Sequence, residues 1–243
     1  MAVKSTFRSM GRHFLDFLFP RACLGCGSAL GGKSTYCYIC SDCLRKIDWI
    51  RNHFCPRCGA PDVENGTICD ECGRKTFSFL RNCSIYAYSG LGRQIIHELK
   101  YRNGRHLLPD IGRMGMEARL DLCDTVLVPV PLHWWRRWLR GFNQSELICE
   151  RLAKIYDCEV CPLLRRNHHT RRQFGLGARA RWKNVGNAFQ INELAFKKMK
   201  IAKNRKITLV DDIFTTGATI EACAKVLVAA GFGHVEALTL ARA

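Results

Sequence analysis

The chain has 243 residues, of which 47% are hydrophobic and 10% aromatic, and its formal net charge at pH 7 is +17. This composition excludes a disordered chain and leaves room for one full α/β core with a small accessory domain. With no apolar run of transmembrane length and no signal peptide, we expect a cytoplasmic protein whose basic surplus favours phosphorylated ligands or nucleic acid, the alternative being that the charge only aids solubility.

Residues 1–20 predict an amphipathic N-terminal helix that is stopped by Pro20. Its apolar residues recur at helical spacing, with arginines on the other side. Such a stripe favours docking on the chain's own domain. The alternative is attachment to a membrane surface.

Eight of the fifteen cysteines form Cys-x-x-Cys pairs, a spacing that directs two sulfurs at one ion. Four thiolates satisfy tetrahedral zinc, so residues 21–82 are expected to form a double zinc ribbon rather than a disulfide scaffold. The predicted ligands are Cys23, Cys26, Cys40, Cys43, Cys55, Cys58, Cys69 and Cys72. Two points stay open from spacing alone. Each zinc ion is bound either by consecutive pairs or by the first with the third pair and the second with the fourth. Cys37 is also an alternative to Cys40 as a zinc ligand.

Residues 83–243 alternate strand and helix patterns, which predicts an α/β domain whose boundary lies near 79–83. We expect strands at 84–88, 125–130, 158–164 and 235–240, and helices at 91–101, 107–119, from 143 or 145 to about 156, and one that ends near Gly231.

Three tryptophans alternate with three arginines after the strand at 125–130: Trp134, Trp135, Arg136, Arg137, Trp138 and Arg140. Aromatic faces beside cations are typical of single-stranded nucleic-acid binding. The competing interpretation is that the tryptophans fill the core while the arginines meet a phosphorylated ligand or solvent.

Two further basic segments follow. Residues 165–184 form a long loop, rich in arginine and glycine, that is suited to neutralise a pyrophosphate and close over a site. The run from Lys197 to Lys206 is expected to be a solvated linker, with nucleic-acid contact as the alternative.

Residues 207–219, Ile-Thr-Leu-Val-Asp-Asp-Ile-Phe-Thr-Thr-Gly-Ala-Thr, predict a buried strand, two acids, a polar turn and the start of a helix. The turn offers hydroxyls, a glycine and helix N-terminal N–H groups, which together suit a phosphate. The neighbouring acids suit hydroxyls. The predicted ligand is therefore a ribose 5-phosphate with a free diol.

This segment resembles the phosphoribosyl pyrophosphate (PRPP) signature of type I phosphoribosyltransferases. The wider combination resembles the ComF family (ComF/GntX-like proteins): the cysteine pairs, Val-Pro-Val-Pro at 128–131, Arg-Gly-Phe-Asn-Gln at 140–144, Gln173-x-x-Leu176, Arg181-x-x-Asn184 and the Asp-Asp segment. The implied fold is α/β, a type I phosphoribosyltransferase-like parallel sheet flanked by helices and preceded by a small N-terminal zinc-ribbon domain.

The resemblance also implies the site residues. Asp211 and Asp212 would hold the ribose hydroxyls and act in catalysis with Arg181. The PRPP-binding set would be completed by Thr215, Thr216, Gly217, Ala218, Thr219, Pro131 and Arg140. Zinc at two structural sites and Mg²⁺ bound with PRPP are the expected cofactors.

Two functions are compatible with these features. The first is a PRPP-binding protein of DNA uptake (natural transformation) or DNA utilisation that binds single-stranded DNA and meets the uptake machinery at the inner face of the membrane. The alternative is an active phosphoribosyltransferase of nucleotide or nucleoside metabolism, which transfers a pentosyl group and releases pyrophosphate. The sequence names no acceptor base or amine.

Overall fold

The structure is a computed structural model, and it describes residues 21–30, 35–61, 63–64, 66–102, 104–166 and 188–243. The predicted N-terminal helix and most of the loop at 165–184 lie outside the described residues. Among the residues described, no helix combines the length and the apolar character that are needed to cross a bilayer.

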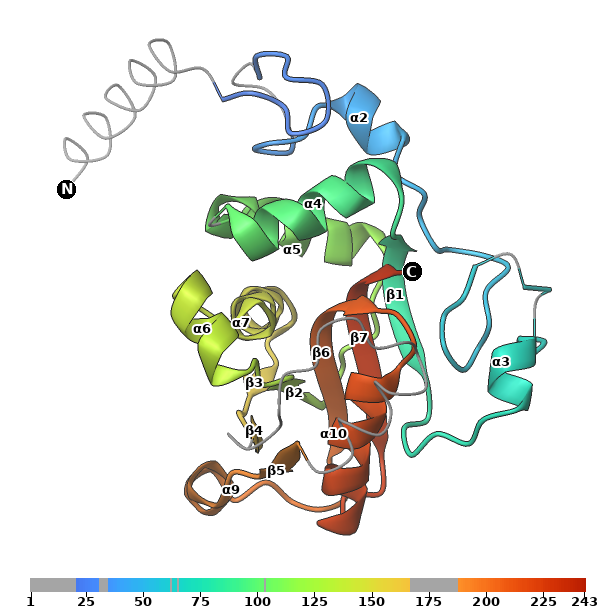
Figure 1. The fold of residues 1–243 in the computed structure, drawn as a ribbon, viewed down its shortest axis with the longest axis vertical. Helices are drawn as coiled ribbons and strands as arrows, with labels where there is room; N and C mark the ends of the chain where they lie inside the picture. The colour runs from blue at the N-terminus through green and yellow to red at the C-terminus, as the bar shows by residue number, and fades with distance from the viewer. Residues whose placement is uncertain (1–20, 31–34, 62, 65, 103, 167–187) are drawn as a thin grey trace.

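A five-stranded parallel sheet forms the centre of the molecule, in the order β1-β7-β6-β2-β3 (Figure 1). Its strands are β1 (Asn82–Ala87), β2 (Thr125–Pro129), β3 (Glu159–Val160), β6 (Lys206–Phe214) and β7 (Val235–Arg242). All five residues of β2 and all eight of β7 are buried. Burial of both faces explains why these strands are continuous apolar runs.

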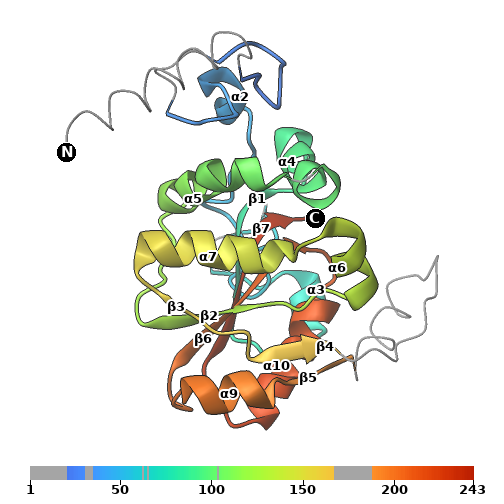
Figure 2. The same cartoon turned by 90° about the vertical axis from the view of Figure 1, so that its left-hand side faces the viewer.

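Helices cover both faces of the sheet (Figures 1 and 2). The face that carries Leu127, Val210 and Leu238 packs against α4 (Gly90–Tyr101), η1 (Gly104–Leu107), α5 (Leu108–Glu117) and α7 (Gln144–Tyr156). The opposite face, with Val128 and Leu209, packs against α10 (Ala218–Ala229). The α/β fold class is therefore confirmed.

The remaining elements surround this sheet. They are α2 (Ser41–Arg45), α3 (Asp70–Gly73), α6 (Trp134–Arg140), α9 (Glu193–Met199), and the antiparallel pair β4 (Leu164–Arg166) and β5 (Phe189–Ile191). Figure 1 shows the segment with α2 above α4 and the segment with α3 beside β1. The N-terminal ribbons thus pack on the sheet domain at two separate places.

Three predicted elements differ from the observed ones. The strand expected at 158–164 is two short strands in different sheets, because Pro162 interrupts it and cannot donate a backbone hydrogen bond. The helix expected at 107–119 is divided between η1 and α5. The basic run beginning at Lys197 is not a linker throughout, since α9 includes its first residues and Lys206 begins β6.

Candidate functional site

The topology places a crevice at the carboxyl ends of β2 and β6, which are neighbours in the sheet. The chain leaves β2 for α7 on one face and leaves β6 for α10 on the other. Open α/β sheets bind ligands at such a switch point. Asn143 fastens the start of α7 to the end of β2, because its amide Nδ2 donates to the Val130 carbonyl oxygen (3.1 Å) and its Oδ1 accepts from the Ser145 N–H (3.2 Å).

The phosphate-type turn follows β6 directly. It consists of residues 215–219, in which Thr215 is exposed, Thr216 and Thr219 are half-buried, and Gly217 and Ala218 are buried at the start of α10. Gly217 has a φ of +76°, and a Cβ atom built on it would lie 2.6 Å from Cζ of Phe214. Position 217 therefore requires glycine for two reasons: its left-handed backbone conformation and its close contact with the Phe214 ring.

Replacing Gly217 by alanine is expected to distort this turn and to lower thermal stability, with a free-energy cost of about 1–3 kcal/mol because both the left-handed backbone and the Phe214 contact oppose a side chain. Gly233→Ala is the matched control, since Gly233 has no positive φ and no atom within 4 Å of the added carbon. Urea unfolding of both variants measures the difference. Equal losses at the two positions would contradict this description of the turn.

Asp211 and Asp212 lie within β6 rather than after it, so the prediction that the strand ends before them is wrong. Neighbouring residues in a strand point to opposite faces, and the two carboxylates accordingly find different partners. Asp212 is buried and pairs with Lys100 Nζ at 2.9 Å. Asp211 accepts from the Ser145 hydroxyl at 3.1 Å and from the Asp212 N–H at 2.9 Å.

The electrostatics of this pair are unusual. Burial, followed by the charge of Asp212, raises the pKa of Asp211 to about 7. Burial and then the Asp212 charge also raise the pKa of Tyr86, whose hydroxyl is buried and forms no hydrogen bond among the described residues. These groups are desolvated hydrogen-bonding atoms near the carboxyl end of β6, and carboxylates of this kind suit a ligand that brings hydroxyls.

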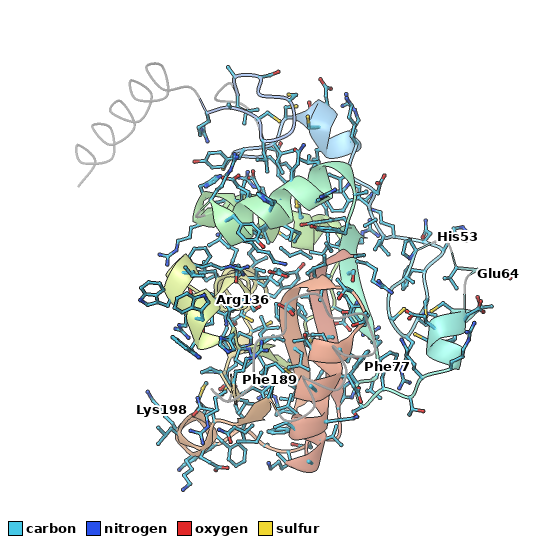
Figure 3. The ribbon with its side chains drawn as sticks, viewed as in Figure 1. His53, Glu64, Phe77, Arg136, Phe189 and Lys198 are labelled. Atoms are coloured by element: carbon cyan, nitrogen blue, oxygen red, sulfur yellow. The ribbon has the colours of Figure 1, made fainter. Side chains whose placement is uncertain are left out.

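Cationic side chains approach the same rim. The Arg140 guanidinium lies over the Tyr101 ring at 5.2 Å, and Pro131 follows Val130, whose N–H donates to the Val210 carbonyl oxygen at 3.0 Å. On β4, Arg166 interacts electrostatically with Asp211 and with Arg136, and burial, then the Arg136 charge, lowers its pKa. Figure 3 labels Arg136 and also Phe189, whose ring lies 5.2 Å from the Arg166 guanidinium.

Most of the predicted PRPP-binding residues thus come together at one end of the sheet, while Arg181 lies outside the described residues. Lys100 and Ser145 were not among the predicted site residues, and Arg166 was predicted only as part of the basic loop at 165–184. Ser145 was expected only as a possible start of a helix. Their relation to the aspartates depends on long-range packing, for which the local sequence carries no signal.

The eight predicted metal ligands form two groups of four, combined in sequence order: Cys23, Cys26, Cys40 and Cys43, then Cys55, Cys58, Cys69 and Cys72. Within each group the Sγ atoms lie within 4.8 Å of one another. The Cys40 N–H donates to Cys23 Sγ (3.3 Å) and the Cys69 N–H to Cys55 Sγ (3.4 Å), which suits thiolates. Both groups fit tetrahedral zinc.

Cys37 lies outside the first group. Its backbone N–H donates to Asp110 Oδ1 (2.6 Å), and its sulfur lies 3.9 Å from Arg113 Nη1. Asp110 is fully buried and also accepts from the Tyr38 N–H (2.7 Å). This carboxylate therefore fastens the first ribbon to α5 and holds Cys37 away from the metal position.

The second group is fastened to the sheet domain in a similar way. Buried Glu221, on α10, accepts from the Ser78 N–H (2.7 Å) and hydroxyl (3.0 Å). Arg242, at the end of β7, lies with Nη2 3.9 Å from Cys58 Sγ and Nη1 3.5 Å from the Phe214 carbonyl oxygen. The second metal group is thus connected to the residue that lies beneath the phosphate-type turn.

Residues 14–73 match the double zinc ribbon domain family. The chain is 31% identical over 233 residues to "DNA utilization protein YhgH" of Escherichia coli (strain K12), covering 92% of this chain and 97% of that protein. It is 30% identical over 213 residues to "Competence protein F" of Haemophilus influenzae, covering 84% and 90%. It is 28% identical over 216 residues to "Competence protein ComFC" of Bacillus subtilis, covering 84% of each.

Among solved structures, the allosteric regulatory enzyme of purine biosynthesis overlaps 56% of this chain and 26% of its own chain, with 18% sequence identity and a TM-score of 0.36.

Proposed function

Because the chain belongs to the ComF family, we propose that it binds PRPP with Mg²⁺ at the crevice between β2 and β6 and that it acts in DNA uptake or DNA utilisation. The names of its relatives, which refer to competence and to DNA utilization, support the second part. We also propose that it works in the cytoplasm, in contact with the uptake machinery at the membrane and with single-stranded DNA.

The observation that carries the PRPP proposal is the meeting of two complementary groups at one switch point. The turn at 215–219 presents the N-terminal N–H groups of α10, which suit a 5-phosphate. On the same strand Asp211 and Asp212 present carboxylate oxygens, which suit the ribose diol.

The pyrophosphate end of the ligand requires cations, and the described residues supply them. Lys100 already pairs with Asp212, and Arg166 and Arg140 approach from β4 and α6. We expect Lys100 to exchange part of its contact with Asp212 for a phosphoryl oxygen when PRPP binds. Mg²⁺ bound with the ligand would neutralise the remaining charge of the pyrophosphate.

Catalysis is the second candidate function, and the small antiparallel β4–β5 sheet favours it because Arg166, on β4, interacts electrostatically with Asp211. In such a reaction the bond between ribose C1 and pyrophosphate breaks, the electron pair leaves with pyrophosphate, and an acceptor nitrogen bonds to C1. Asp211, Asp212 and Arg181 would position the sugar and the leaving group. A screen of bases for pyrophosphate release tests this activity.

Calorimetric titration with PRPP and Mg²⁺ tests the binding proposal. The unaltered chain is expected to bind, and the Asp211→Asn/Asp212→Asn double variant is expected to bind at least about 100-fold more weakly, because two charged hydrogen-bond acceptors are lost. The matched control is Asp121→Asn/Asp124→Asn, which changes the net charge equally at two exposed residues before β2. Equal affinity in the two double variants would refute the assignment, as would no heat of binding by the unaltered chain.

A further inference from the structure

The helix α6, Trp134–Arg140, has no buried residue. The exposed fractions of Trp134, Trp138 and Leu139 are 49%, 70% and 62%. The interpretation that these tryptophans fill the core is therefore wrong for Trp134 and Trp138. Large apolar side chains exposed together on one short helix are typical of an interaction site.

The exposed aromatic surface extends from α6 to α4. Trp135 and Trp138 stack with ring centroids 5.2 Å apart. Tyr101, the last residue of α4, is 66% exposed, and the Arg140 guanidinium lies over its ring at 5.2 Å. The two helices thus present flat rings with a cation between them, and flat rings are the groups on which unpaired bases stack.

The charge on this surface is positive and mostly uncompensated. Arg137 is paired with Glu146 at 3.0 Å, but Arg102, Arg136 and Arg140 take part in none of the ion pairs found among the described residues. Arg102 also lines a hollow of about 300 Å³ beside the first zinc ribbon, together with Leu24, Arg93, Gln94, His97 and Glu98. Two arginines and one carboxylate of α4 and its C-cap thus lie between α6 and the ribbon.

We propose that these side chains form a binding platform for single-stranded DNA. The α4–α6 platform consists of Tyr101, Arg102, Trp134, Arg136, Trp138 and Arg140. The inference rests on the proposed role in DNA uptake or utilisation and assigns the surface at which the DNA binds. Bases stack on the three rings while the arginines contact the phosphates, a combination that requires unpaired bases and that a duplex cannot satisfy.

The platform begins where the proposed PRPP site ends. Lys100, which pairs with Asp212, directly precedes Tyr101 on α4, and Arg140 joins Tyr101 to α6. Arg136 interacts electrostatically with Arg166, whose other charged neighbour is Asp211 (Arg136 is labelled in Figure 3). A bound strand would therefore pass within one or two side chains of the ribose-phosphate crevice.

The stacking faces are tested by fluorescence anisotropy of a labelled 15-nucleotide deoxythymidine oligomer with the zinc-loaded full chain. Trp134→Ala/Trp138→Ala is expected to weaken binding by at least about 30-fold, since each stacked base contributes roughly 5-fold or more. Trp49→Phe, far along the chain in the first ribbon region, is expected to bind like the unaltered chain. A duplex of the same length is expected to compete poorly, and equally tight duplex binding would overturn the proposal.

The charges are tested by the salt dependence of the same binding. Arg136→Gln/Arg140→Gln is expected to reduce the slope of log affinity against log salt by about 1.4, because two phosphate contacts are lost. The control with the same charge change is Arg45→Gln/Arg74→Gln, on the two ribbons, which is expected to keep the slope. If only Arg45→Gln/Arg74→Gln reduced the slope, the platform would be refuted and the DNA would be assigned to the ribbons.

Two further outcomes separate this inference from the proposed function. No binding of the oligomer by the unaltered chain at physiological salt would overturn the DNA role itself and the platform with it. Normal DNA binding by both platform variants would overturn the platform alone. Binding of the unaltered chain to phosphatidylserine vesicles that depends on Trp138 and excludes the oligomer would show that α6 is a membrane contact. PRPP binding by Trp134→Ala/Trp138→Ala, which changes none of the proposed PRPP-binding residues, is expected to remain unchanged.

Discussion

Replacing Cys72 by serine is expected to remove one zinc equivalent, to lower thermal stability and to weaken PRPP binding on the order of tenfold or more. Replacing Cys43 by serine is expected to remove the other zinc equivalent and to leave PRPP binding nearly unchanged. Each residue is the last cysteine of its group and each is buried, so the two variants are closely matched. Structural zinc stabilises small ribbons strongly. Each variant is therefore expected to destabilise the ribbon that loses its zinc by a large amount.

The difference between the two variants follows from the contacts of Phe214. This residue ends β6 and lies beneath Gly217. The Arg242 guanidinium lies over the Phe214 ring at 5.0 Å and reaches Cys58 Sγ. The Phe79 ring meets the Phe214 ring edge-on, with centroids 6.1 Å apart, and is tilted against the Phe77 ring at 4.7 Å (Phe77 is labelled in Figure 3). Loss of the second zinc is expected to free Cys58, so that Arg242 and Phe79 no longer hold the Phe214 ring in place. The turn at 215–219 would then lose the ring that supports Gly217.

Among the residues that the structure describes, the first zinc group has no such connection to Phe214. Its ribbon packs against α4 and α5 in the other hydrophobic cluster, where Tyr36 donates to Glu117 (2.7 Å) and Asp110 accepts from the ribbon backbone. Zinc content by atomic emission, melting by circular dichroism and PRPP titration of both variants measure the effect. If the two variants lost PRPP affinity equally, the loss would reflect general destabilisation, and the proposed coupling through Phe214 would be abandoned.

Local patterns were sufficient to predict β1, β2, β7 and the start of β6, but not the bounds of β3 or the end of β6. The run at 125–130 is apolar and β-branched without interruption, and a buried parallel strand is the structure that satisfies it; β2 occupies 125–129. The helix expected to start at Asn143 or Ser145 is α7, with Asn143 as its N-cap. Both predictions depended only on residues that are close together in the sequence.

Features that depend on distant residues were not predictable. The sequence Trp-Trp-Arg-Arg-Trp-Leu-Arg has no single apolar stripe, so α6 was not predicted to be a helix. The choice between Cys37 and Cys40 depends on Asp110, which takes the Cys37 amide from 73 residues away. For the same reason the site pairs Asp212 with Lys100 and Asp211 with Ser145. These contacts form only once α4 and α7 have packed on the sheet, and the local sequence around Asp211 and Asp212 does not specify them.

The second large effect is expected from Asp211→Asn, which should stabilise the unliganded protein at pH 8 while it weakens PRPP binding. The pKa of Asp211 in the folded protein is raised to about 7 from an ordinary value of 3.8. Between these two values the folded state holds a proton that the unfolded state has released, so the stability of the protein falls as pH rises from about 4 to 7. Above pH 7 the folded state carries the full penalty of a desolvated carboxylate next to Asp212.

Asparagine has nearly the same shape as aspartate, and its side-chain oxygen can accept the hydrogen bond from the Ser145 hydroxyl. Because it carries no charge, the variant does not pay the cost of desolvating a carboxylate. We expect the free energy of unfolding of Asp211→Asn to exceed that of the unaltered chain by about 1–3 kcal/mol at pH 8, and the two to be nearly equal at pH 4. Urea unfolding at the two pH values measures the difference, with the surface substitution Asp124→Asn as the control that should show none. A carboxylate that lowers stability in this way agrees with the proposed contact to the ribose hydroxyls, which would use its charge. If Asp211→Asn were instead less stable at pH 8, the side chain would serve the fold, and the argument for a binding role at this position would be lost.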